Sequence, residues 1–163
     1  MRASGRMIAG VLVLAAASGA ARADGDPALD YMLNCQGCHR AEGAGTAGSV
    51  PALSGSVARF LAVPEGREFL VRVPGVAQSV LDDERLAALL NWLVTRFDAG
   101  HVPKDFRRYT AAEVARLRRR PLTDVEGLRR RLLADIEPSI TKRAASPRRE
   151  PGGEPRAPLV RRR

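Results

Sequence analysis

The sequence has few of the residues on which most active sites depend. Its 163 residues include only two cysteines, two histidines and seven aromatic residues. We find no pattern typical of a general base, a nucleophile or a substrate pocket, so the sequence does not predict an enzyme. Strand-like alternation of apolar residues and internal repeats are absent too. What remains predicts an all-α chain.

Long apolar runs are also lacking. The one extended run, residues 7–20, has about 14 residues, whereas a membrane span needs roughly 20. It follows two arginines and precedes a small-x-small site at residues 21–23. This pattern predicts that residues 1–23 are a signal peptide and that the mature chain is exported to the periplasm, with an uncleaved anchor as the alternative.

The positive charge is concentrated at the two ends of the chain. The formal net charge is +9, but residues 24–143 contribute only +2 of it, and residues 144–163 hold six arginines against two glutamates. The excess therefore does not describe a folded basic face, and we expect no nucleic-acid partner. Prolines and arginines after residue 143 predict a disordered basic tail over 144–163.

The positions of the aromatic residues divide the middle of the chain into two parts. All seven lie between residues 31 and 109, and large rings dominate core packing. We therefore expect a compact small domain over 24–100 and a helical extension over 101–143. Helix-capping patterns mark starts at Asp26-Pro27 and at two capping boxes, Thr110 with Glu113 and Thr123 with Glu126. Negative charge at Asp82 to Glu84 marks the start of the clearest helix, expected from about residue 82 to 97. Further short helices are expected near 55–62 and 65–71, and Pro74-Gly75 is expected to break the chain.

The segment with chemical content is Cys35-Gln36-Gly37-Cys38-His39. In C-x-x-C-H, both thiols can add to the vinyl groups of a haem, and the next histidine binds the iron. This attachment also accounts for two cysteines in an oxidising compartment. The alternatives are a Cys35–Cys38 disulfide or a zinc site, which would need four ligands.

With this motif, the chain resembles the class I monohaem cytochrome c family over roughly residues 26–98. The resemblance rests on Tyr31 four residues before Cys35, on the loop Gly48 to Leu53, and on the helix from Leu81 to Trp92. It implies one covalent haem c, with His39 on the iron and the Pro51 carbonyl accepting a hydrogen bond from His39. Leu53, Tyr31 and Trp92 would pack around the haem and the first helix.

The chain departs from the family at the second axial ligand. The family supplies a methionine shortly before its last helix, and the matching position here is Val73. The only methionine after residue 23 is Met32, which lies three residues before Cys35. The iron therefore lacks the methionine that the resemblance implies.

Three arrangements of the sixth iron position stay open. His101 could bind the iron and give bis-histidine ligation. The position could instead be empty or hold water in an apolar pocket formed by Val73 and Val76. A weaker ligand such as Gln78 or Lys104 is the third arrangement.

The resemblance and the predicted export together indicate a periplasmic one-electron carrier that serves a dehydrogenase or a respiratory chain. The missing methionine supports a second hypothesis, a haem-based binder or sensor of small ligands. Basic runs at Arg116–Arg120 and Arg129–Arg131 suggest an acidic redox partner or weak contact with a membrane surface. We expect a monomer.

Overall fold

The computed structural model describes residues 25–145. The predicted signal peptide and residues 146–163 of the predicted tail lie outside the described residues. In the described part, the backbone is helical or irregular, and the only β-type pairing there is an isolated bridge between Thr46 and Val50. This confirms the all-α class. The helices are α1 (Pro27–Asn34), α2 (Gln36–His39), η1 (Val57–Ala62), α3 (Pro64–Arg72), α4 (Pro74–Ala77), α5 (Asp83–Asp98), η2 (Ala99–His101), α6 (Ala111–Leu117) and α7 (Val125–Ala145).

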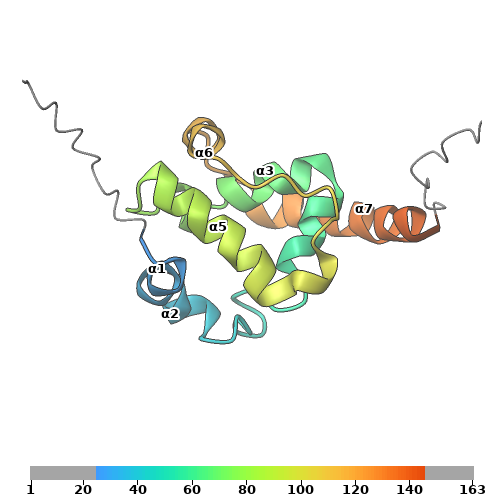
Figure 1. Ribbon diagram of the computed structural model, residues 1–163. Coiled ribbons are helices and arrows are strands. Elements are labelled where there is room, and N and C mark those ends of the chain that lie inside the picture. The colour runs from blue at the N-terminus through green and yellow to red at the C-terminus, as the bar shows by residue number, and fades with distance from the viewer. Residues whose placement is uncertain (1–24, 146–163) are drawn as a thin grey trace, which may run out of the picture.

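Helix α5 lies at the centre of the molecule. Figure 1 shows it crossing the middle, with α1 and α2 on one side and α6 on the other. Helices α1, α6 and η1 all contact α5, while α7 packs against η1 and α3. Helix α1 is therefore held against the same helix that supports α6.

Side-chain caps begin the main helices where the sequence predicts them. Asp26 accepts a hydrogen bond from the Ala28 amide at 2.9 Å, and Asp82 accepts one from the Arg85 amide at 2.8 Å. Thr110 Oγ1 accepts from the Glu113 amide at 3.2 Å. These bonds satisfy amides that the first helical turn would leave without partners.

One helix prediction is wrong in detail. The cap of α7 is Asp124, which accepts from the Gly127 amide at 2.8 Å, and not Thr123. Helix α3 ends at Arg72 and Val73 is not helical, so the helix breaks where Pro74-Gly75 predicts, and Pro74 then starts the short helix α4. The stretch expected near 55–62 only as helical forms a 3-10 helix over Val57–Ala62.

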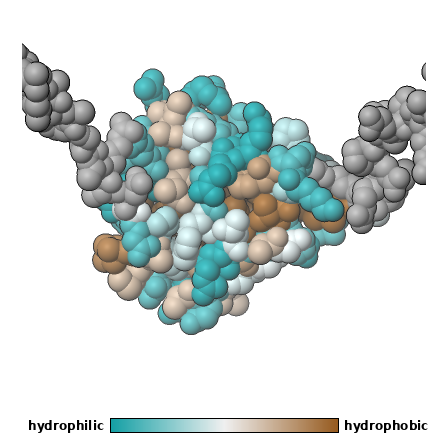
Figure 2. Space-filling view, viewed as in Figure 1, coloured by the Kyte–Doolittle hydropathy of each residue, from teal (hydrophilic) through white to brown (hydrophobic). Residues whose placement is uncertain are grey.

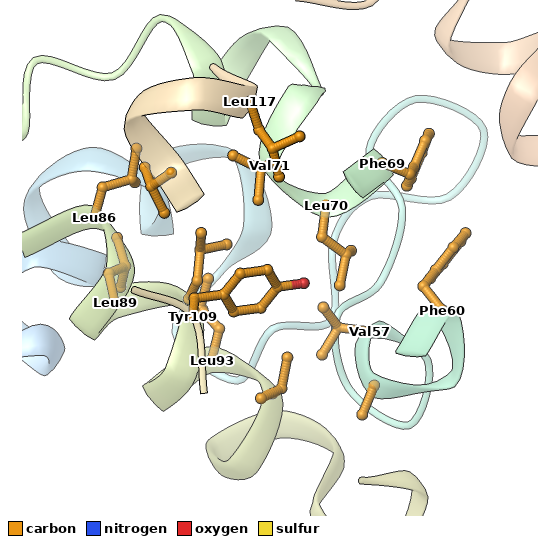
Figure 3. Close-up of a cluster of buried hydrophobic side chains, with 14 of the residues drawn as sticks. Val57, Phe60, Phe69, Leu70, Val71, Leu86, Leu89, Leu93, Tyr109 and Leu117 are labelled. Atoms are coloured by element: carbon orange, nitrogen blue, oxygen red, sulfur yellow. The ribbon is translucent and has the colours of Figure 1, made fainter. Parts of the chain in front are cut away.

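The hydrophobic core extends further along the chain than the aromatic residues suggest. The apolar face of α5 is buried as predicted, but α6 and α7 contribute to the same cluster. Figure 3 shows the Tyr109 ring reaching into this cluster, with Leu117 beside Val71. Residues 101–143 are thus built into one core with residues 24–100. Their buried members are Tyr109, Val114, Leu117, Leu128, Leu132 and Ile136.

The face seen in Figure 2 mixes hydrophilic and weakly hydrophobic residues, with one strongly hydrophobic area right of centre and a smaller one at the left edge. The exposed large hydrophobic residues of the described part include Leu29, Met32 and Leu33 of α1, and Val80. Between residues 25 and 145, no helix combines the length and apolar character of a membrane span.

Candidate haem site

The two cysteines lie at the junction of α1 and α2. Cys35 caps the end of α1, and its carbonyl accepts hydrogen bonds from the amides of Cys38 at 3.2 Å and His39 at 3.0 Å. Both thiols and the imidazole therefore lie on one turn of five residues, 35–39. Both thiols are free: Cys35 is half-buried and Cys38 is exposed. Burial raises the pKa of the Cys35 thiol.

Tyr31 fixes this turn against the core. Its ring is buried, with ring centroids 5.7 Å from Trp92 and 4.9 Å from Phe97 of α5. Its hydroxyl donates to the Arg40 carbonyl at 2.5 Å. Arg40 itself has φ 66°, a left-handed backbone that ends α2. The tyrosine therefore reaches across the motif and holds the chain just after His39.

An ion pair attaches the same helix to α5. Asp30, whose side chain is 1% exposed, accepts from Arg85 Nε at 3.2 Å and also from its Nη2. A buried carboxylate requires such a partner, because desolvation of an unpaired charge is costly. Nothing in the sequence marks this pair, because the two residues are far apart in the chain.

The His39 ring is oriented by a backbone carbonyl. Its Nδ1 lies 3.1 Å from the Pro51 oxygen. Because a carbonyl can only accept, Nδ1 carries the proton in this bond and Nε2 is left with a free lone pair. Burial lowers the pKa of His39, with the bond to Pro51 acting in the opposite direction. A half-buried neutral imidazole with a free Nε2 is a good metal ligand.

The loop between residues 40 and 55 brings Pro51 to His39. The Gly45 amide donates to the His39 carbonyl at 3.0 Å, and the Thr46 amide donates to the Val50 carbonyl at 2.8 Å. Gly45 has φ +66°, and a Cβ there would lie 2.3 Å from the Val50 oxygen and 2.7 Å from the Pro51 oxygen. Glycine is therefore needed for the close approach of this loop.

The other predicted packing residues surround the core at its edge. Leu53, Val73 and Trp92 are partly buried and pack against the hydrophobic cluster, as does Val76. Val73 precedes α4 and accepts hydrogen bonds from the amides of Val76 and Ala77, both at 2.9 Å. An aliphatic side chain at this position offers no ligand to iron.

His101 is engaged at the far end of α5. Its Nδ1 lies 2.5 Å from Asp98 Oδ1, and the second carboxylate oxygen of Asp98 accepts from the Ala58 amide at 2.8 Å. Asp98 is buried. The structure thus places His101 in a polar link between η2 and η1. Gln78 and Lys104 are exposed, and Met32 is 51% exposed on α1.

The donor set fits a covalently attached haem. Two free thiols and one imidazole with an available Nε2 share a single turn, which is what thioether attachment and axial ligation require. Among the residues that the structure describes, no group of three or more His, Cys, Asp and Glu side chains could hold a metal ion. An all-helical core carrying this set defines a haem protein of the c type.

Comparison with known proteins agrees. The chain is 37% identical over 123 residues to a cytochrome c-552 of Thermus thermophilus, covering 64% of this chain and 82% of that protein. A second cytochrome c-552 from the same species is 37% identical over 107 residues, covering 55% of this chain and 82% of the relative. No protein-family model matches. The chain belongs to the class I c-type cytochromes, electron-transfer proteins whose cofactor is covalently bound haem c.

The extent of the match adds two observations. Residues 1–100 amount to less than 64% of the chain, so the match to the first relative continues into 101–163. The alignment of 123 residues is also longer than the share of this chain that it covers, so within the match the relative has residues that this chain lacks.

Proposed function

We propose that this cytochrome is an exported, periplasmic one-electron carrier that serves a dehydrogenase or a respiratory chain. Haem c is attached through Cys35 and Cys38, and His39 is the axial ligand. The observation that supports this most directly is the His39–Pro51 hydrogen bond of 3.1 Å on the turn that carries two free thiols. The bound group supplies the one-electron chemistry. The chain's own residues attach it, orient its ligand and cover it.

Each of the predicted site residues has a role in this proposal. Pro51 fixes the His39 tautomer and raises the basicity of the ring. Tyr31 and Trp92 hold the attachment turn against α5, as their ring contact supports. Leu53 and Val73, partly buried at the edge of the core, provide apolar cover for the haem.

The test is expression of the full chain in a host that attaches haem to cytochromes. We expect a red protein whose intact mass exceeds that of the processed chain by one haem. Cys35→Ser and Cys38→Ser should each lose one thioether link, and His39→Ala should alter the visible spectrum. His101→Ala is the matched control for the second histidine. A colourless wild-type protein of bare chain mass would refute the proposal.

A second candidate function is binding of small ligands at the iron. Two observations favour it: Val73 cannot bind iron, and His101 is held by buried Asp98. On this proposal the sixth position is empty or holds water. The oxidised protein should then give a high-spin signal in electron paramagnetic resonance, and the reduced protein should bind carbon monoxide quickly. A low-spin spectrum that His101→Ala abolishes would establish bis-histidine ligation instead.

The partner we propose is an acidic redox protein, with weak contact to an anionic membrane surface as the alternative, and the carrier itself is monomeric. Of the predicted basic runs, Arg116, Arg119 and Arg120 are exposed on and just after α6, as are Arg130 and Arg131 on α7. Surface charge steers such encounters and is screened by salt. Electron exchange with an acidic partner should therefore slow as ionic strength rises. No change with salt would contradict this partner.

A further inference from the structure

One arginine of the C-terminal extension, Arg118, donates several hydrogen bonds to the connection between α4 and α5. Arg118 follows α6, and its side chain is only 17% exposed. Its Nε donates to the Ala77 carbonyl at 3.0 Å, and its Nη1 donates to the Leu81 carbonyl at 2.8 Å. The same Nη1 lies 3.0 Å from Asp83 Oδ1, and Nη2 donates to the Ser79 carbonyl. One guanidinium thus binds four acceptors spread over seven residues.

The extension is joined to the same region a second time. Arg72, the last residue of α3, donates from Nε to the Arg120 carbonyl at 2.8 Å, and its own carbonyl accepts from the Leu122 amide at 2.9 Å. Residues 73–83 are therefore fastened at both ends to residues 118–122. This base is rigid, because Leu117 and Val71 are both completely buried and lie side by side in the core (Figure 3).

Ala77 and Leu81 anchor the connection in the core, but much of the rest of it is exposed. Val80 is 90% exposed, and Gln78 and Asp82 are exposed as well. Segments with few buried apolar contacts open at low free-energy cost. A planar guanidinium that offers donors in several fixed directions can order such a chain, whereas a lysine ammonium acts as a single point charge.

We propose that Arg118 is a positioning residue for the sixth side of the haem. It orders residues 77–83, which follow Val73. At Val73 the chain has no methionine that could restrain this segment by binding the iron. This inference rests on the proposed function, in which Val73 lies on that side of the haem. Loosening the connection therefore changes how readily a small neutral ligand, such as imidazole or carbon monoxide, reaches the iron. Although Arg118 belongs to the basic run 116–120, its guanidinium holds the chain's own backbone and does not contribute to the surface proposed for the redox partner.

The test compares Arg118→Gln with Arg119→Gln in the haem-loaded full chain. Arg119 is the neighbouring exposed arginine and serves as the matched control. The first readout is hydrogen exchange of amides 78–82. Removal of hydrogen bonds to a charged group should speed exchange by at least about tenfold in Arg118→Gln. The second readout is the association rate of imidazole with oxidised protein, which should change by several-fold. Arg119→Gln should leave both within about twofold of the wild type.

The outcomes separate the two proposals. Unchanged exchange in Arg118→Gln overturns the positioning role, whatever the haem does. Faster exchange with an unchanged imidazole rate overturns the link to the iron. A protein without haem refutes the proposed function, while exchange still tests the hold on residues 77–83. If Arg118→Gln fails to fold, Arg118→Lys and Asp83→Asn weaken the same contacts and are judged by the same criteria.

Discussion

Single residues decide how the His39 imidazole is oriented. The Pro51 carbonyl reaches His39 because Gly45 leaves room for it, with a Cβ there falling 2.7 Å from the Pro51 oxygen. Motif reading identifies Cys35, Cys38 and His39, and the family resemblance adds Pro51. Neither could identify Gly45, since its role depends on the three-dimensional path of the loop.

Replacement of Gly45 by alanine should displace the Pro51 carbonyl. We expect a weaker bond to His39, a less basic ring and hence a more positive reduction potential. We also expect a loss of about 1–3 kcal/mol in stability from the left-handed backbone and the clash. Voltammetry and thermal unfolding measure these effects.

Gly48 provides the control. It has φ +77° but open space around its Cβ position, so Gly48→Ala carries the backbone strain without the clash. Equal potentials in the two variants would show that Gly45 does not act through Pro51.

Glu113 makes a pH-dependent contribution to stability. Arg67 binds both of its oxygens, at 2.7 and 2.8 Å, and this hydrogen bonding lowers the pKa of Glu113 below its ordinary value of 4.5. In the unfolded chain the pKa returns to its ordinary value, so the unfolded state binds the proton first as pH falls. The stabilisation is therefore present above about pH 4.5 and is lost on acidification through the lower, folded-state pKa.

Glu113→Gln should flatten this acid limb of the stability curve, measured by denaturant unfolding between pH 6 and the onset of acid unfolding. Glu126→Gln is the control, because the Glu126 side chain is 92% exposed and its nearest arginine nitrogen is 3.8 Å away. If both variants keep the wild-type slope, the Arg67–Glu113 pair is not its source.

At the scale of elements, the starts of helices were predictable and some of their ends were not. The caps at Asp26, Asp82 and Thr110 depend only on residues close in the sequence, so helix starts there can be predicted locally. Helix α7 runs to Ala145, beyond its last buried residue, Ile136. It continues past Pro138, although the fixed φ and missing N–H of proline disfavour a helix interior.

A buried amide connects α5 to the segment before α6. Asn91 Nδ2 donates to the Tyr109 carbonyl at 3.0 Å, and the Tyr109 amide donates to Asn91 Oδ1 at 2.7 Å. Asn91→Ala leaves both backbone groups of Tyr109 buried without these partners. We expect a loss of roughly 2–5 kcal/mol in the free energy of unfolding.

Thr95→Ala is the matched control on the same helix. Its hydroxyl bonds only to carbonyls of its own helix, those of Asn91 and Trp92, so its replacement should change stability by less than about 0.5 kcal/mol. Similar small effects in both variants would mean that the Asn91 link contributes little.

At the scale of the whole molecule, the extension and the haem-bearing part share one core. The composition suggests the opposite, because the aromatic residues stop at position 109 and the core residues after it are ordinary leucines, a valine and an isoleucine on amphipathic helices. Which face each helix meets is settled by packing over long sequence distances. The role of Arg118 could not be predicted from the sequence for the same reason. Nothing in a run of arginines distinguishes the one whose side chain hydrogen-bonds to backbone about 40 residues earlier.

A shared core predicts a single cooperative unfolding transition. Soret absorbance follows the haem site, and far-UV circular dichroism also follows α6 and α7. The two midpoints should coincide in denaturant. A separate early loss of helical signal, with the Soret band intact, would show that the extension folds independently of the site.

The Arg118 contacts also bear on attempts to make a smaller cytochrome from this chain. A version ending near residue 100 would retain Cys35, Cys38 and His39, the residues proposed to hold the haem. It would nevertheless lose the Arg118 guanidinium, which hydrogen-bonds to residues 77–83, and the α6 and α7 side chains that form part of the hydrophobic core. Transplanting the haem-bearing half onto another scaffold would therefore require a substitute for both, either a new cation at that loop or a methionine in place of Val73 that lets the metal itself secure the chain.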